Sequence, residues 1–311
     1  MFSTRWFLLP DDRLRAGWRL LLFGALCTVS LFLFQWTASA FSRDLNSPVA
    51  VLAASSAAFL AAVCTATWLA MSLLEHQPFS AVGLTLRKRA MLQAAEGFAI
   101  GAGLVGAITG VEWLLGAIHF QSSGAGAMPA LALIGSGAGI FVLSAASEEL
   151  LFRGYAYQRL IEGTNDYVAV AVSAIFFGAV HQWNPHVTSL ALANTILAGV
   201  LLAVAYLKTR ALWLPIGFHF SWNWTLALFG LPISGVDLGK MPWEAVSSSS
   251  HVWLYGGEYG PEGGIVASAV LVVGIVCMLA YGGHVSPTPR DQKGDPIAGD
   301  DSPTIAGDPS R

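Results

Sequence analysis

The fold is decided by one long stretch that carries no charge before its final position, residues 48–75, which reads PVAVLAASSAAFLAAVCTATWLAMSLLE. A helix that crosses the hydrocarbon core of a bilayer needs about 20 predominantly apolar residues. Seven further stretches are long and apolar enough to be considered, at 17–40, 91–117, 130–159, 167–183, 187–207, 212–230 and 264–282. The sequence therefore predicts an all-α, polytopic membrane helix bundle with about eight transmembrane helices.

The composition supports contact with a lipid bilayer. Of the 311 residues, 55% are hydrophobic and only 11% are charged, whereas a soluble domain carries roughly 25% charged residues. The net charge of −3 is small, and no basic cluster is dense enough to indicate a nucleic-acid partner. We therefore expect an integral, multi-pass membrane protein that does not bind nucleic acid.

The distribution of Lys and Arg predicts that both termini are cytoplasmic. With the amino terminus inside, 14 of these residues fall on cytoplasmic segments and 2 on outer segments, as the positive-inside rule requires. The inner set is Arg5, Arg13, Arg15, Arg19, Arg87, Lys88, Arg89, Arg153, Arg159, Lys208, Arg210, Arg290, Lys293 and Arg311, and the outer set is Arg43 and Lys240.

The predicted organisation has a cytoplasmic segment at 1–16, a transmembrane bundle at 17–282 and a tail at 283–311. The tail is rich in Pro, Gly and Asp, so it cannot bury a core and we expect it to be a disordered cytoplasmic segment. Between the last two spans, residues 231–263 form an outer loop rich in Gly, Ser and Trp. The acidic residues of this loop are Asp237, Glu244, Glu258 and Glu262.

Two pairs of glycines four residues apart occur within the spans, Gly97 with Gly101 and Gly135 with Gly139. Glycine at this spacing allows two helix backbones to approach closely. The general frequency of glycine in membrane helices explains both pairs equally well, so close packing is one of two interpretations.

Ionisable side chains inside a span are the most informative feature, since each costs about 2.5–3.5 kcal/mol on insertion scales and usually marks function. The span 130–159 contains Glu148, Glu149 and Arg153. Glu149 and Arg153 are four residues apart, so they can pair on a helix. Glu148 lies about 100° further around the helix and has no obvious partner, which makes it the candidate general base. A solvated, interfacial helix face is the competing interpretation.

Two further spans carry polar groups. His181 lies near the end of the span 167–183, and a single histidine there is commonly an interfacial polar residue. His219 and Asn223 share one face of the span 212–230, where an imidazole without a partner is costly. Because each group is least stable alone, we expect the three spans to bring these side chains together.

These residues resemble the three motifs of the CPBP family, the CAAX proteases and bacteriocin-processing enzymes, which include the Rce1-like CAAX prenyl proteases. The motifs occur in the family's order as Glu148-Glu149-xxx-Arg153, Phe177-xxx-His181 and His219-xxx-Asn223. The segment from Arg13 to Arg19 is also similar to members of the family. The resemblance implies a CPBP-type protease bundle at 17–282 with its motif core at 130–230.

The resemblance also implies an activity and a set of roles. The chain would hydrolyse a peptide bond of a membrane-associated peptide or protein, with Glu148 and His181 activating a water. His219 and Asn223 would stabilise the oxyanion, and Glu149 and Arg153 would orient the site. A competing account of the family makes Glu148, His181 and His219 candidate ligands of a catalytic zinc ion. The sequence leaves the metal-dependent and metal-free mechanisms equally open.

Two alternatives belong to other functional classes. A non-catalytic scaffold or immunity protein of the same fold would tolerate loss of the motif residues, which are all present here. A transporter or proton relay predicts inverted repeats with broken helices, and the sequence has no such symmetry.

The predicted depths of the motif residues differ. Glu148 lies within its span, whereas His181 falls near the outer end of a short one. Convergence of the two requires helix tilt, a longer fifth helix or a water-filled cavity.

Overall fold

The structure is a computed structural model that describes residues 7–9, 13–86, 88–124, 126–237, 241, 243–247 and 252–282, without the side chains of 44, 127, 129 and 130. The predicted tail at 283–311 and much of the predicted segment at 1–16 lie outside the described residues.

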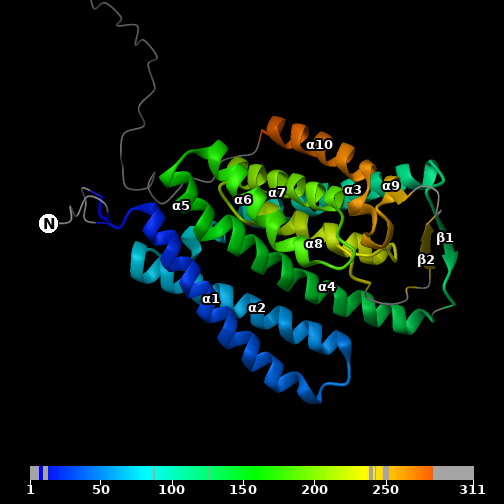
Figure 1. Cartoon of the computed structure of the whole chain (residues 1–311), viewed down its shortest axis with the longest axis horizontal. Coiled ribbons are helices and arrows are strands. Elements are labelled where there is room, and N and C mark those ends of the chain that lie inside the picture. Colours follow the sequence, from blue (N-terminus) through cyan, green and yellow to red (C-terminus); the bar gives the residue numbers. More distant parts are fainter. Residues whose placement is uncertain are drawn as a thin grey trace, which may run out of the picture.

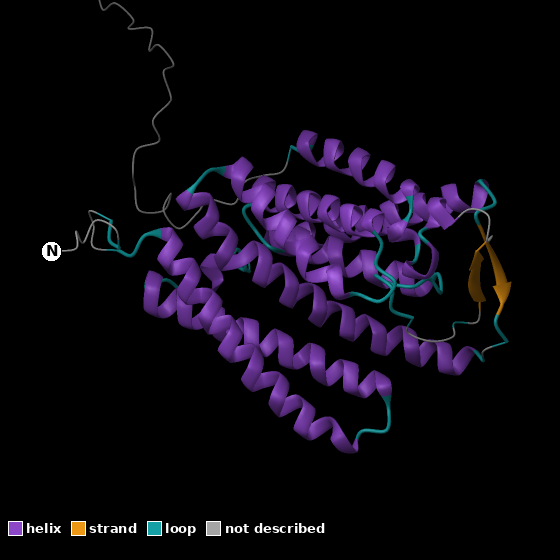
Figure 2. Cartoon of the chain, viewed as in Figure 1, coloured by secondary structure: helices purple, strands orange, loops and turns teal. Residues whose placement is uncertain are grey.

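Helices account for almost all regular structure in the described part of the chain (Figures 1 and 2). Eight apolar helices coincide with the eight predicted spans, which confirms the all-α membrane bundle. They are α1 (Ala16–Phe41), α2 (Pro48–Ala70), α3 (Lys88–Leu114), α4 (Ala127–Glu149), α6 (Asp166–Val180), α7 (Ser189–Thr209), α8 (Trp213–Leu228) and α10 (Ile265–Ala280). Local sequence sets several starts: Ser47, Asn165 and Thr188 accept hydrogen bonds from backbone N–H groups in the first turns of α2, α6 and α7.

Five described segments are long and apolar enough to cross a membrane: Ala16–Phe41, Pro48–Glu75, Lys88–Leu114, Leu131–Gly163 and Ser189–Thr209. Two of them contain a turn of π-helix, η3 (Met71–Glu75) at the end of α2 and η5 (Leu150–Gly154) after α4. The chain continues from η5 into α5 (Tyr155–Gly163). The single long span predicted at 130–159 is therefore α4, a π-turn and most of α5.

A small β-ribbon was not predicted from the sequence. Strand β1 (Ile118–Ser122) pairs antiparallel with β2 (Trp243–Ser247), at the end of the bundle opposite the start of α1 (Figure 1). Each strand has five residues, too short for an alternating pattern to stand out. The remaining short elements are η2 (Ser42–Asp44), η4 (Phe79–Val82), η6 (His181–Trp183), α9 (Val252–Tyr255), η8 (Gly257–Tyr259) and η9 (Pro261–Gly263).

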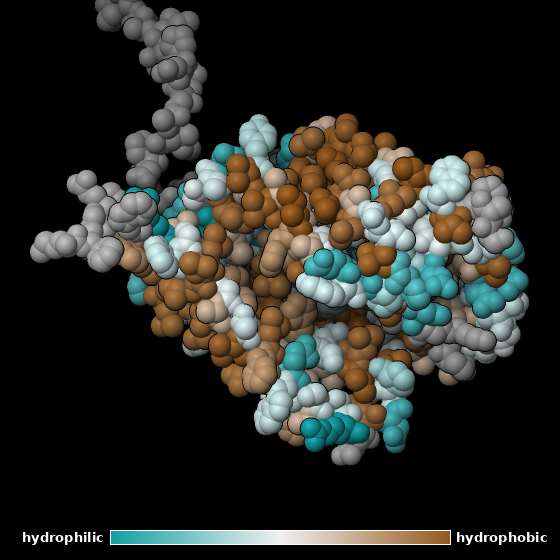
Figure 3. Space-filling model, viewed as in Figure 1, coloured by the Kyte–Doolittle hydropathy of each residue, from teal (hydrophilic) through white to brown (hydrophobic). Residues whose placement is uncertain are grey.

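The outside of the bundle is apolar. Large apolar side chains are exposed on several helices, among them Phe32 on α1, Leu92 on α3 and Val273 on α10. Figure 3 shows broad apolar areas over one face of the molecule. Exposed apolar surface of this extent suits contact with lipid, and the chain is an integral membrane protein.

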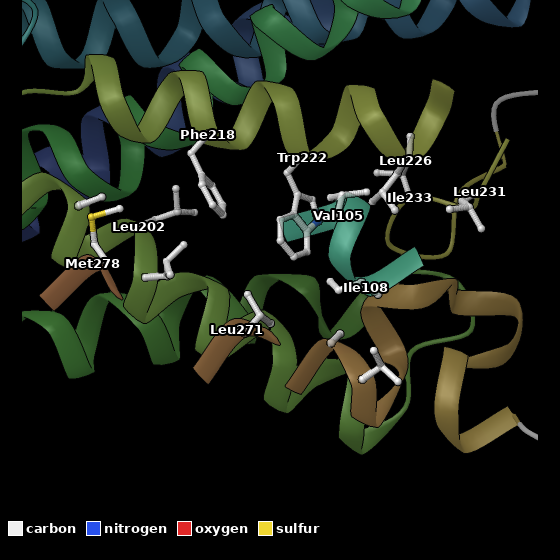
Figure 4. Packing of buried hydrophobic residues seen from close by; sticks show 14 of the residues in the cluster. Val105, Ile108, Leu202, Phe218, Trp222, Leu226, Leu231, Ile233, Leu271 and Met278 are labelled. Atoms are coloured by element: carbon white, nitrogen blue, oxygen red, sulfur yellow. The ribbon is translucent and has the colours of Figure 1, made fainter. Parts of the chain in front are cut away.

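The interior is built around α8. Figure 4 shows Phe218 and Trp222 of α8 pointing into the same apolar cluster as Leu202 of α7 and Leu271 of α10. The rings of Phe218 and Trp222 stack with their centroids 5.6 Å apart. These two aromatic residues flank the turn of α8 that carries His219, so the core fixes the direction of that imidazole.

A buried ionic cluster joins the helices at the opposite end of the bundle from the β-ribbon. Arg19 on α1 forms ion pairs with Glu75 at 2.9 Å and with Glu162 at 2.6 Å. Arg159 on α5 pairs with the same two carboxylates, at 2.6 and 3.1 Å. This cluster attaches α1 and the end of α2 to α5.

One of the two glycine pairs makes a close helix–helix contact. A Cβ atom added at Gly97 of α3 would lie 2.1 Å from the carbonyl oxygen of Leu214 on α8, and one added at Gly101 would lie 2.5 Å from that of Phe218. Close packing is therefore confirmed for this pair. It was the wrong interpretation for Gly135 and Gly139, because nothing lies within 4 Å of a Cβ at either.

This difference provides a matched pair of variants. We expect Gly97→Ala to lower the free energy of unfolding by about 1–3 kcal/mol, because α3 and α8 must move apart to admit the methyl group. Gly135→Ala adds the same methyl group at an exposed position of α4 and should leave stability unchanged or slightly improved. Thermal unfolding of both variants in one detergent measures the effect. Equal unfolding midpoints would show that the close contact between α3 and α8 at Gly97 does not limit stability.

Three of the helices are short, which leaves room for irregular segments of the chain to pack over their ends. Helices α6, α8 and α10 have 15, 16 and 16 residues, about 22–24 Å at 1.5 Å a residue, against a hydrocarbon core of about 30 Å. The described parts of 231–264 pack over the helix ends. Asn194 on α7, for example, donates through Nδ2 to the carbonyl oxygens of Glu262 and Gly264, both at 2.8 Å. Irregular backbone at membrane depth is stable where it is buried or lines a cavity.

Candidate active site

The first motif lies where α4 passes into its π-turn. Glu148 and Glu149 are the last two residues of α4, and Arg153 lies within η5. Glu149 and Arg153 are both 0% exposed and form the expected ion pair, with Nη1 3.1 Å from Oε1. π-turns often occur at functional sites in helices.

Arg153 connects three helices. Besides Glu149 it donates through Nη2 to the carbonyl oxygen of Gly199 on α7, at 3.1 Å. Its guanidinium carbon lies 4.4 Å from the ring centroid of Phe177 on α6, a cation–π contact. The pair of charges therefore holds α4 against α6 and α7.

Glu148 keeps one oxygen without a donor. Oε1 accepts a hydrogen bond from the Ser144 hydroxyl at 3.1 Å, whereas no described protein group donates to the buried Oε2. Oε2 lies 3.8 Å from Nε2 of His181 and 3.8 Å from Nε2 of His219. The structure thus brings together the carboxylate and both imidazoles that the sequence predicted to converge.

The hydrogen bonds of the two histidines define their tautomers. Nδ1 of His181 lies 2.6 Å from the carbonyl oxygen of Phe177, and Nδ1 of His219 lies 2.8 Å from Oε1 of Glu149. Both partners accept hydrogen bonds, so each Nδ1 carries a hydrogen. In the neutral form each Nε2 therefore has a lone pair, and both lone pairs belong to nitrogens near Glu148 Oε2.

A cavity of about 270 Å³ opens beside these atoms, large enough for several water molecules. Asn223, one turn after His219 on α8, also lines it. The lining residues that matter for chemistry are Ser144, Glu148, His181, His219, Asn223 and Glu262. The cavity and the short α6 explain how His181, directly after that helix, reaches the depth of Glu148.

Glu262 is a lining residue that the sequence did not assign to the site. Its Oε1 accepts a hydrogen bond from the indole Nε1 of Trp222 at 2.8 Å, and its Oε2 accepts from the backbone N–H and the hydroxyl of Ser234. A glutamate within Gly260-Pro261-Glu262-Gly263 is typical of an exposed turn. No local signal distinguishes it from the other acidic residues of the predicted outer loop.

The spacing of Glu148, His181 and His219 can be compared with that of zinc ligands. Tetrahedral zinc with bonds of about 2.0–2.1 Å places neighbouring ligand atoms about 3.3 Å apart, less than the 3.8 Å from Glu148 Oε2 to either imidazole. Over the described residues, no group of three or more His, Cys, Asp or Glu side chains is arranged to hold a metal ion. Glu148, His181 and His219 are therefore spaced wider than zinc ligation requires, and the metal-dependent mechanism stays a prediction.

Comparison with known proteins adds an independent finding. Residues 130–225 match the family model described as type II CAAX prenyl endopeptidase Rce1-like, and this range contains all seven residues named in the three motifs. The chain has no significant match among curated proteins. Residues 130–225, the segment that forms the candidate site, are therefore similar to the Rce1-like type II CAAX prenyl endopeptidases, a peptidase family.

Proposed function

We propose that this protein is an intramembrane endopeptidase that hydrolyses a peptide bond of a membrane-associated substrate with a water activated by Glu148 and His181. The observation that carries the proposal is the arrangement around Glu148. Its buried Oε2 has no described protein donor and lies 3.8 Å from two imidazole nitrogens. Two acceptors 3.8 Å apart form no direct hydrogen bond, but a water between Glu148 and His181 can donate one hydrogen to each.

The chemistry follows from that position. The water oxygen attacks the carbonyl carbon as one of its protons passes to the Glu148 carboxylate. When the tetrahedral intermediate collapses, the C–N bond breaks and the leaving nitrogen takes a proton from Glu148. The carboxylate is thereby restored, and the products are a carboxylic acid and an amine.

His219 and Asn223 are suited to stabilise the oxyanion, each donor contributing about 10²–10³ in rate. Because Nδ1 of His219 donates to Glu149, its Nε2 donates only when the ring is an imidazolium. The Glu149 carboxylate favours that form. Glu149 and Arg153 are thus positioning residues, which set the orientation and charge of His219.

Cleavage of a peptide library tests the proposal. Wild-type protein and His219→Ala, in proteoliposomes, are incubated with membrane-anchored peptides of varied sequence, and fragments are identified by mass spectrometry. We expect cleavage by the wild type and a loss of about 10²-fold or more in the variant. If the correctly folded wild type yields no fragments, the protein is a scaffold, or a transporter that a flux assay on the same vesicles would reveal.

Metal content is measured on the same preparations. If the mechanism is metal-free, cleavage activity should survive chelation and should not correlate with the amount of bound metal. Stoichiometric zinc that is lost together with activity would instead support the metal-dependent mechanism.

A further inference from the structure

The segment that closes the cavity contributes its own carboxylate. Glu262 lies in η9 (Pro261–Gly263), between the β-ribbon and α10, and lines the same cavity as Glu148 and His181. Hydrogen bonds fix both its backbone and its side chain, because Asn194 donates to its carbonyl oxygen and Trp222 donates to its carboxylate. The carboxylate is therefore a fixed feature of the cavity wall.

The hydrogen bonds of Glu262 suit the ionised form. One oxygen faces the indole N–H of Trp222 and the other faces the backbone N–H of Ser234, and both of these groups can only donate. Burial raises the pKa of Glu262, and the hydrogen bonds from Trp222 and Ser234 offset only part of that effect. The wall therefore holds a carboxylate whose charge is incompletely compensated.

The described side chains compensate it only in part: the charge interaction with His181 lowers the pKa of Glu262, but by less than burial raises it. The described lining residues include Glu148, Glu262 and two histidines, but neither Lys nor Arg. Arg153 does not line the cavity, because it is fully buried and forms an ion pair with Glu149. Buried charges in proteins are normally paired, and Oε1 of Glu262 accepts a single hydrogen bond from the described residues. The cavity thus suits a ligand that brings its own positive charge.

We propose that Glu262 receives the side chain of a Lys or Arg residue of the substrate and so determines which peptides are cleaved. This inference rests on the proposed peptidase function of the same cavity. Because an extended peptide advances about 3.3 Å a residue, a cavity of about 270 Å³ places the basic residue within about three positions of the cleaved bond.

The test compares anchored peptides that differ only in one residue, Lys or norleucine, placed at each position within three residues of the cleaved bond. We expect the wild type to prefer Lys at one position by about 10- to 100-fold in kcat/KM, the size of a charge-assisted hydrogen bond. Glu262→Gln should reduce that preference to less than about 3-fold while still cleaving the norleucine peptide.

Two variants separate charge from structure. Glu258→Gln removes a carboxylate from the same segment that is 81% exposed and pairs with His186, and it should keep the preference. Trp222→Phe removes one hydrogen bond to Glu262 but leaves its charge, so the preference should persist even if stability falls. If Glu262→Gln slows cleavage of the Lys and norleucine peptides equally, Glu262 only fastens the segment and the proposal is wrong.

Binding provides a readout that does not depend on cleavage. In a Glu148→Ala background, fluorescence anisotropy should show tighter binding of the Lys peptide by about 10-fold or more, and the added change Glu262→Gln should abolish that difference. Such binding without cleavage by the wild type would contradict the peptidase proposal and support only the recognition of a basic side chain by Glu262. Cleavage without any preference for Lys would support the peptidase proposal and contradict the proposed role of Glu262.

Discussion

Glu148→Gln is expected to lower kcat for peptide cleavage by about 10³- to 10⁴-fold, with little change in the free energy of unfolding. Removal of a general base accounts for a loss of up to about 10⁴. The amide has the same shape and can still accept the hydrogen bond from Ser144. It cannot take a proton from water, and its NH₂ group would compete with water for the lone pair of His181 Nε2.

The measurement is a single-turnover cleavage assay in proteoliposomes, with thermal unfolding as the check on folding. Glu112→Gln is the matched control, because Glu112 on α3 is buried and its oxygens, like Oε2 of Glu148, have no described hydrogen-bond partner. It does not line the cavity, so its loss should leave cleavage unchanged. A fall of less than about 10-fold in folded Glu148→Gln would mean that another group activates the nucleophile.

The helices were predictable because length and apolarity are local properties. The ion pair was predictable for the same reason, since Glu149 and Arg153 are four residues apart on one helix. The convergence of His181 and His219 on Glu148 followed from the cost of leaving each polar group alone in lipid. The depth of His181 in the bundle did not follow from this cost, because it depends on α6 ending at Val180 and on the segments that pack over that end.

The parts that could not be predicted depend on contacts between distant segments. β1 and β2 are more than 100 residues apart in the sequence, and neither is long enough to show its periodicity. The orientation of His181 depends on the carbonyl oxygen of Phe177, and a backbone acceptor leaves no mark in the sequence. Glu262 reaches the cavity through a turn built on glycines. At Gly264, for example, a Cβ would lie 1.8 Å from the carbonyl oxygen of Leu254.

Arg153→Met is expected to have the largest effect on stability, a loss of about 3–5 kcal/mol, because it leaves the Glu149 carboxylate buried without its main counter-charge. Arg153→Lys keeps the charge and should lose less. Its single ammonium cannot reproduce the planar contacts to Glu149, the carbonyl oxygen of Gly199 and the ring of Phe177. Equilibrium unfolding in a mixed-detergent titration measures these differences.

The double variant Arg153→Met, Glu149→Gln separates stability from catalysis. Removing both charges leaves no unpaired ion, so we expect stability to recover to within about 1–2 kcal/mol of the wild type. Cleavage should not recover, because the neutral amide that replaces the Glu149 carboxylate no longer favours the imidazolium of His219, to which that carboxylate is hydrogen-bonded at 2.8 Å. If the double variant regains full activity, the ion pair only holds the helices together and His219 works without a carboxylate. A stable but inactive double variant would mean that the ion pair also sets the charge of the oxyanion site.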